Sequence, residues 1–138
     1  MSYARAELPP ITLSTPDFER LERLANAAAD KFPRTADFLA REISRAEIVP
    51  SAHALPGLVT MDSTVEFRDD ASGQARTVTL VYPDQADVSA GKISVLTPIG
   101  VALIGLSVGQ SIEYESPAGG WRSLTVLRVI GERSDAVL

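Results

Sequence analysis

The sequence contains no cysteine, and this absence excludes disulfide bonds, thiolate zinc sites and cysteine nucleophiles. It contains one histidine, His53, so a phosphohistidine enzyme or a histidine metal site would depend on that residue alone. No apolar run reaches membrane-spanning length, and the N-terminus lacks a hydrophobic stretch of the signal-peptide type. We therefore expect a cytoplasmic protein with no membrane partner.

Motifs of the common enzyme classes are also missing. The chain has no G-x-x-x-x-G-K-[ST] loop, no G-x-G-x-x-G after a strand and no G-x-S-x-G around a serine. His53 falls in a stretch rich in proline and small residues, where an exposed linker position explains it best. Asp69 and Asp70 are adjacent carboxylates, but they fall in a turn cluster. The sequence thus predicts no catalytic residue, no metal site and no cofactor.

The charge balance disfavours direct binding to nucleic acid. Thirteen Lys and Arg stand against eighteen Asp and Glu, which gives a net charge of -5. A protein that binds duplexes needs a basic face to neutralise phosphates. The nearest candidates are four arginines interleaved with acids, as expected of solvated helix faces with local ion pairs. These arginines are Arg20, Arg23, Arg41 and Arg45.

The chain has 138 residues, of which 45% are hydrophobic and 22% charged, so it is long enough to bury one sizeable core. Shifts in composition divide it into four parts. They are a tail (1–13), a helical hairpin (14–49), a linker rich in proline (50–58) and a sheet domain (59–138).

The hairpin is predicted from helical spacing of apolar residues and from capping signals. Ser14 is the expected N-cap of the first helix, and Pro33 is expected to end it. Thr35 is the expected N-cap of a second helix that stops before Pro50. Two helices of similar length joined by a short loop must lie antiparallel. We expect a short, thin coiled coil with its tip at Asp30–Asp37.

The remainder of the chain is predicted to form strands and one short helix. Apolar and polar residues alternate along Val59–Phe67, and a turn cluster follows before the next strand. The helix begins with Pro98 and ends at Gly105. The other expected strands are Arg76–Tyr82, Lys92–Thr97, Ile112–Tyr114 and a last one from Trp121. The fold class is therefore α+β, a helical hairpin followed by an antiparallel sheet with one helix on it.

Three runs in this sheet domain resemble a known family. Leu96–Leu106, followed by Val108–Ile112, resembles the signature of the C-terminal domain of the Gre transcript-cleavage factors. Thr60–Arg68 and Thr79–Pro83 resemble the first two sheet strands of the Rnk proteins, the regulators of nucleoside diphosphate kinase. Together with the hairpin, the resemblance to the Rnk family covers nearly the whole chain. It implies an FKBP-like sheet domain.

The resemblance also implies a contact with RNA polymerase. In Gre factors this domain docks at the rim of the secondary channel, and a Ser-Pro turn lies at the contact. Thr97-Pro98 occupies that position here, with Leu96 where Gre factors carry an acid and Ile99 directly after the proline. The alternative is an ordinary turn from strand to helix, with proline at the first helical position.

The predicted hairpin tip differs from the tip of a cleavage factor. In Gre factors a long coiled coil enters the channel, and acidic residues at its tip help to hold a catalytic magnesium ion. Here Asp30 and Asp37 flank the basic residues Lys31 and Arg34, whereas a cation site would need clustered carboxylates. Asp37 is equally explained as a first-turn acid, and Asp30 as a solvated residue.

The leading hypothesis is a non-enzymatic transcription regulator that binds RNA polymerase near the secondary channel and competes there with Gre factors. The alternative is an FKBP-like peptidyl-prolyl isomerase or peptide-binding module. Such a site needs a pocket walled by aromatic rings. The candidates for those rings are Phe67, Tyr82, Tyr114 and Trp121. A third hypothesis, an effect on nucleoside diphosphate kinase, allows either direct action or action through transcription.

Overall fold

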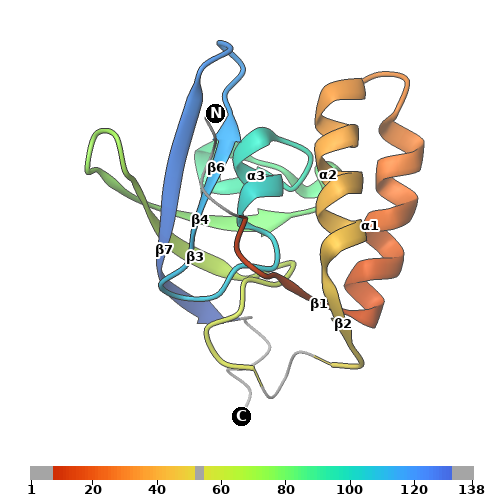
Figure 1. Ribbon diagram of the computed structural model, residues 1–138, viewed down its shortest axis with the longest axis horizontal. Helices are drawn as coiled ribbons and strands as arrows, with labels where there is room; N and C mark the ends of the chain where they lie inside the picture. The colour runs from red at the N-terminus through yellow and green to blue at the C-terminus, as the bar shows by residue number, and fades with distance from the viewer. Residues whose placement is uncertain (1–7, 52–54, 132–138) are drawn as a thin grey trace.

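The computed structural model describes residues 8–51 and 55–131, and within them the expected α+β class is confirmed. Two antiparallel helices stand beside a curled sheet, with a third, short helix between them (Figure 1). The helices are α1 (Thr15–Ala28), α2 (Pro33–Arg45) and α3 (Pro98–Leu103). The strands are β1 (Thr12–Ser14), β2 (Glu47–Val49), β3 (Thr64–Asp69), β4 (Ala75–Val81), β5 (Lys92–Ser94), β6 (Ser111–Glu115) and β7 (Trp121–Gly131).

The first helix of the hairpin begins where the sequence predicts, but the second helix begins earlier than predicted. Ser14 caps α1, because its Oγ accepts a hydrogen bond from the backbone N–H of Asp17 at 3.3 Å. The N-cap of α2, however, is Phe32, and Pro33 is the first residue of that helix. The expectations that Thr35 caps the second helix and that Pro33 only ends the first are therefore wrong. Proline lacks an N–H that the first turn does not use, so it starts a helix as readily as it ends one.

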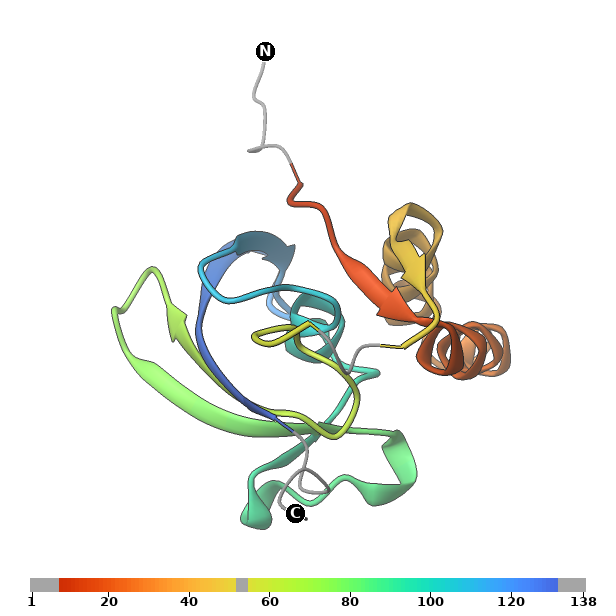
Figure 2. The ribbon, with the colours of Figure 1, turned by 90° about the horizontal axis from the view of Figure 1, so that it is seen from below.

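The main sheet has the strand order β5-β4-β3-β7-β6. The sequence predicts a wholly antiparallel sheet, and this prediction is wrong for one strand. β3 pairs antiparallel with both β4 and β7, and β6 pairs antiparallel with β7, but β5 runs parallel to β4. Two short 3₁₀ turns, Pro83–Gln85 and Val88–Ala90, carry the chain back so that β5 begins at the same end as β4. Figure 2 shows how strongly this sheet curls.

The alternating pattern that begins at Val59 extends beyond the strand it predicts. β3 starts only at Thr64, and Asp62 has a positive φ of 70°, which interrupts an extended backbone. Val59 instead pairs with the segment after α3, since its N–H donates to the carbonyl of Leu106 at 2.8 Å. The carbonyl of Val59 accepts from the N–H of Gly105 at 3.0 Å. The buried alternate residues here come from this loop pairing and not from a ladder.

Residues 11–13, which the sequence assigned to a tail, are part of the folded core. Ile11 and Leu13 are each only 2% exposed, and β1 pairs with β2 in a small parallel sheet. The N–H of Thr12 donates to the carbonyl of Gly105 at 3.1 Å. Gly105 has φ +84°, and a Cβ there would lie 3.0 Å from the Cβ of Ile11. The segment therefore joins the helical hairpin to the sheet domain.

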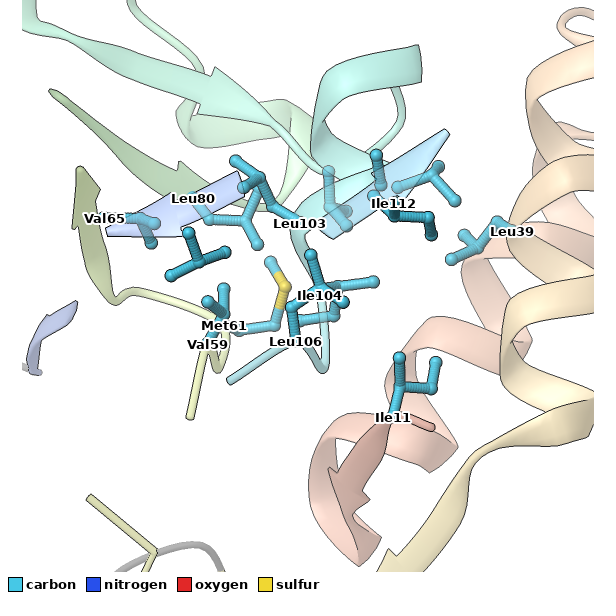
Figure 3. Close-up of a cluster of buried hydrophobic side chains, with 14 of the residues drawn as sticks. Ile11, Leu39, Val59, Met61, Val65, Leu80, Leu103, Ile104, Leu106 and Ile112 are labelled. Atoms are coloured by element: carbon cyan, nitrogen blue, oxygen red, sulfur yellow. The ribbon is translucent and has the colours of Figure 1, made fainter. Parts of the chain in front are cut away.

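One hydrophobic core unites the hairpin and the sheet domain. The buried cluster contains residues of both helices, such as Leu21 and Leu39, together with Leu103 of α3 and Ile112 of β6. Figure 3 shows Leu39 directed from the hairpin toward Ile112. The hairpin thus packs along the sheet domain through α2 and α3. The predicted linker 50–58 includes residues 52–54, and with them His53, that lie outside the described residues.

Candidate functional site

The predicted polymerase contact is the turn that starts α3. Thr97 is the N-cap, as its Oγ1 accepts from the N–H of Gly100 at 3.0 Å. The same hydroxyl donates to the carbonyl of Ser94 at 2.7 Å, which ties the turn to the end of β5. Pro98 occupies the first helical position. Both bonds of the hydroxyl are therefore used inside the fold, so Thr97 has a structural role whether or not a partner contacts it.

Gly100 makes this turn rigid. A Cβ at this position would lie 2.4 Å from the carbonyl oxygen of Ser94 and 2.7 Å from the Cα of Val95. The helix therefore approaches the strand as closely as backbones allow. Leu96 and Ile99 are half-buried and pack against the core. The hydrogen bonds of Thr97 and the close approach at Gly100 thus fix the conformation of the turn.

The structure separates the residues predicted for the hairpin tip. Asp30 and Lys31 are exposed in the loop between α1 and α2, whereas Asp37 lies inside α2. Asp37 pairs with Arg41 at 3.0 Å, one turn further along the helix. Arg34 pairs with Glu115 at the end of β6 at 3.3 Å. Within residues 8–51 and 55–131, no group of three or more His, Cys, Asp or Glu side chains is placed to hold a metal ion.

A groove that the sequence does not predict lies between α2 and β6. It has a volume of about 430 Å³, and its lining includes Arg34 from the hairpin and Pro98 from the α3 turn. The groove therefore borders both of the predicted contact regions. Its apolar lining comes from Leu8, Phe38, Tyr114, Pro117 and Trp121. No local motif could reveal it, because its walls come from segments more than a hundred residues apart in the sequence.

The charges on α2 in this groove are mostly compensated. Arg45 forms an ion pair with Glu42 at 2.7 Å, and Glu42 is only 3% exposed. Arg45 also donates to the carbonyl of Pro9, which holds the segment before β1 against the helix. The amide of Gln110 donates to the neighbouring carbonyl of Pro10 at 3.1 Å. These bonds hold the segment before β1 against α2 and against the residue that precedes β6.

Of the four candidate aromatic residues of the sheet domain, only Tyr114 and Trp121 line the same groove. Phe67 is 1% exposed in the core, and Tyr114 is 5% exposed. Tyr82 lies elsewhere, beneath the guanidinium of Arg20, which is 4.1 Å from the ring centroid. Burial, followed by the charge of Asp17, raises the pKa of Tyr82 to about 12. The aromatic pocket required by the isomerase alternative is therefore not formed by these rings.

The adjacent carboxylates Asp69 and Asp70 join the β3–β4 turn to β7. The hydroxyl of Ser123 donates to Asp70 at 2.7 Å, and that of Thr125 donates at 2.9 Å. Partial burial raises the pKa of Asp70, but hydrogen bonds, the one from Ser123 foremost, outweigh it and hold the pKa below its usual value. The hydrogen bond from Arg122 lowers the pKa of Asp69. The carboxylate of Asp69 also accepts from the backbone N–H of Ala71 at 2.9 Å, which agrees with the turn-forming interpretation.

Comparison with known families agrees with this geometry. Residues 54–130 match the family model "Transcription elongation factor, GreA/GreB, C-term", so the sheet domain is of the Gre-factor class. Residues 9–49 match the model "Rnk N-terminus". The two matches follow one another along the chain and together span almost all of the described residues. The chain belongs to the Rnk family, and its sheet domain belongs to the GreA/GreB C-terminal family.

Individual relatives support the assignment. The "Regulator of nucleoside diphosphate kinase" of Escherichia coli K12 is 38% identical over 88% of this chain and 89% of its own length. The "Transcription elongation factor GreA" of Rhodospirillum rubrum is 42% identical, but the match covers 55% of this chain and 48% of that factor. A solved structure, "Prokaryotic transcription elongation factor GreA/GreB from Nitrosomonas europaea", is 43% identical, with a TM-score of 0.68. It is matched over 88% of this chain and 98% of its own.

No helix in the described part of the chain is long and apolar enough to cross a membrane.

Proposed function

We propose that this chain is a non-enzymatic, cytoplasmic regulator that binds RNA polymerase near the secondary channel. The observation that carries the proposal is the pair of family matches, Rnk for the hairpin and GreA/GreB for the sheet domain, in one continuous chain. In this proposal the sheet domain is FKBP-like, the hairpin is a short coiled coil, and the sheet domain supplies most of the interface.

The α3 turn is the proposed polymerase contact. The hydrogen bonds of Thr97 and the tight approach at Gly100 give Leu96, Thr97, Pro98 and Ile99 one fixed arrangement. A preformed turn loses little conformational entropy on binding, which favours its use as a contact. Pro98 also borders the groove, so a partner seated on the turn would lie close to α2.

Two features of the hairpin support a regulator that does not cleave transcripts. α1 has 14 residues and α2 has 13. The hairpin is therefore roughly 21 Å long at 1.5 Å per residue. Asp37, which lies inside α2, is paired with Arg41, and in the loop at the tip Lys31 is next to Asp30. A carboxylate that is already paired with a guanidinium is a poor ligand for a magnesium ion. We propose that the hairpin obstructs the channel and thereby competes with Gre factors.

The test is a pull-down of purified core RNA polymerase with this protein, with a Gre factor added as competitor. The variant Thr97→Asp/Pro98→Ala alters the proposed contact. Aspartate can still cap Gly100 but cannot donate to the carbonyl of Ser94, so thermal melting checks that the variant is folded. The matched control Pro83→Ala/Asp84→Ala changes an exposed turn elsewhere on the sheet domain. We expect the wild type and the control to bind, the Gre factor to displace them, and the contact variant to bind at least tenfold more weakly.

A cleavage assay on stalled elongation complexes completes the test. We expect the Gre factor to shorten the stalled transcript and this protein to leave it intact. Absence of binding at micromolar concentration, with the Gre factor bound in the same assay, would overturn the proposal. Transcript shortening by this protein would overturn its non-enzymatic part.

A further inference from the structure

The groove between α2 and β6 runs along an edge of the main sheet. β6 is the last strand in the order β5-β4-β3-β7-β6, so one of its sides has no partner strand. Three consecutive residues of β6, Glu113, Tyr114 and Glu115, line the groove. Successive side chains of a strand point to opposite faces, so a surface that touches three in a row follows the edge of the strand and not one face. Figure 1 shows β6 and α2 on either side of α3.

The hydrogen-bond pattern shows which backbone groups face the groove. The N–H of Val126 donates to the carbonyl of Gln110 at 3.0 Å, and the N–H of Ser116 donates to the carbonyl of Gly120 at 2.8 Å. Residues of an antiparallel strand point alternately toward and away from their partner strand. Positions 110, 112, 114 and 116 therefore face β7. The backbone N–H and carbonyl of Glu113 point away from β7, to the side of the groove.

The groove also offers one uncompensated charge. Within the described residues, Arg34, Arg41 and Arg45 each form an ion pair with an acid. Glu113, in contrast, has no ion pair and no side-chain hydrogen bond there, although it is half-buried. A half-buried carboxylate gains from a basic side chain brought by a partner. The excess charge of the groove is thus negative, and its complement is a basic residue.

Aromatic side chains beside this edge provide an apolar anchor point. Trp121 is 54% exposed at the start of β7, next to Pro117 of the β6–β7 turn. Phe38 is half-buried on the opposite wall, on α2. Tryptophan is one of the residue types enriched among those that contribute most of the binding energy of protein interfaces.

We propose that the groove between α2 and β6 binds an extended segment of a partner protein, which adds to the sheet as a strand beside β6. The main chain of the segment pairs with the outward N–H and carbonyl of Glu113. One of its side chains is apolar and packs between Phe38 and Trp121, and another is basic and pairs with the Glu113 carboxylate. This site adjoins the proposed polymerase contact, because Pro98 of that contact also lines the groove.

The test uses a displayed library of random twelve-residue peptides, panned against the full chain. We expect enrichment of peptides that combine a basic residue with an aromatic or aliphatic one. The Glu113→Pro variant removes the outward N–H at an edge position, where proline is tolerated. We expect it to weaken the enriched peptides at least tenfold. The matched control Ser111→Pro makes the same change at the first residue of β6, which also faces away from β7 but lies outside the groove. The segment seated in the groove does not reach it, so we expect binding within twofold of wild type.

A second variant tests the charge. Glu113→Gln keeps the backbone and the shape, and we expect it to weaken peptide binding several-fold and to reduce the dependence of binding on salt. Thermal melting checks that each variant is folded. If Glu113→Pro melts well below wild type, slowed exchange of the Glu113 amide in the wild-type complex replaces it as the readout. Failure to enrich any peptide, equal binding by both proline variants, or a helical bound peptide would each overturn the proposal.

Discussion

Position 100 has no room for a side chain, and this gives a residue-scale prediction. We expect Gly100→Ala to lower the free energy of unfolding by about 3 kcal/mol, because its Cβ would meet backbone atoms at 2.4 and 2.7 Å. Gly120→Ala is the matched control, since a Cβ there meets nothing within 4 Å. Urea unfolding of both variants measures the difference, and an equally small effect at both positions would contradict the close approach.

Asp70 links stability to pH. Its pKa is held below its ordinary value of 3.8 in the folded state, so the folded state binds fewer protons than the unfolded chain. The stability from this group is therefore present above about pH 4 and is lost as the pH falls through its folded pKa.

We expect Asp70→Asn to lose stability at pH 6 and to lose less than wild type on transfer to pH 3. Urea midpoints at the two pH values measure this. Asp30→Asn, on the exposed hairpin loop, is the control and should behave as wild type. An unchanged fall in Asp70→Asn would show that its hydrogen bonds to β7 contribute no pH dependence.

At the scale of elements, the start of α3 depends on the hydroxyl of Thr97. We expect Thr97→Ala to cost about 1–2 kcal/mol, because it removes the cap on Gly100 and the bond to Ser94. Thr97→Ser keeps the hydroxyl and should cost less than about 0.5 kcal/mol. Chemical denaturation compares the two. Equal losses would mean that the methyl group and not the hydroxyl stabilises the turn.

Elements with local signals were predictable from the sequence. Ser14 precedes an apolar helical repeat, and Thr97-Pro98 precedes an apolar run, so both helix starts follow from capping chemistry. Pro33 was assigned to the end of a helix because proline punctuates both ends. The parallel placement of β5 depends on the path of residues 83–91, which local patterns do not determine. The strand predicted from Val59 was shortened by pairing with Leu106, a contact distant in sequence.

The candidate site was predictable only in part, for the same reason. The turn at 96–99 is one continuous motif, and the resemblance to Gre factors brought it to notice. The groove depends on α2, α3 and β6 meeting in space, and no single stretch of sequence contains them. Exposed Trp121 follows two glycines, so the sequence indicated a strand start and not the rim of a groove.

At the scale of the whole molecule, the shared core predicts one cooperative unfolding transition. Leu39 of α2 is fully buried in the same cluster as Leu103 and Ile112 of the sheet domain. We expect far-UV circular dichroism, dominated by the hairpin, and the fluorescence of Trp121, the single tryptophan, to give the same urea midpoint.

Leu39→Ala should lower both midpoints together, with a loss of about 3 kcal/mol. Val88→Ala, at a side chain that is 85% exposed, is the control and should leave both unchanged. Two separate transitions, or a Leu39→Ala effect confined to the helical signal, would mean that the hairpin and sheet domain fold independently.

The most direct test of the central claim is hydrogen–deuterium exchange of this protein with and without core RNA polymerase. The account predicts slower exchange on binding at residues 96–103 and no change at residues 83–91, which form the connection between β4 and β5. It also predicts that an excess of Gre factor reverses the protection. Protection confined to residues 83–91, or no protection anywhere at saturating polymerase, would contradict the account.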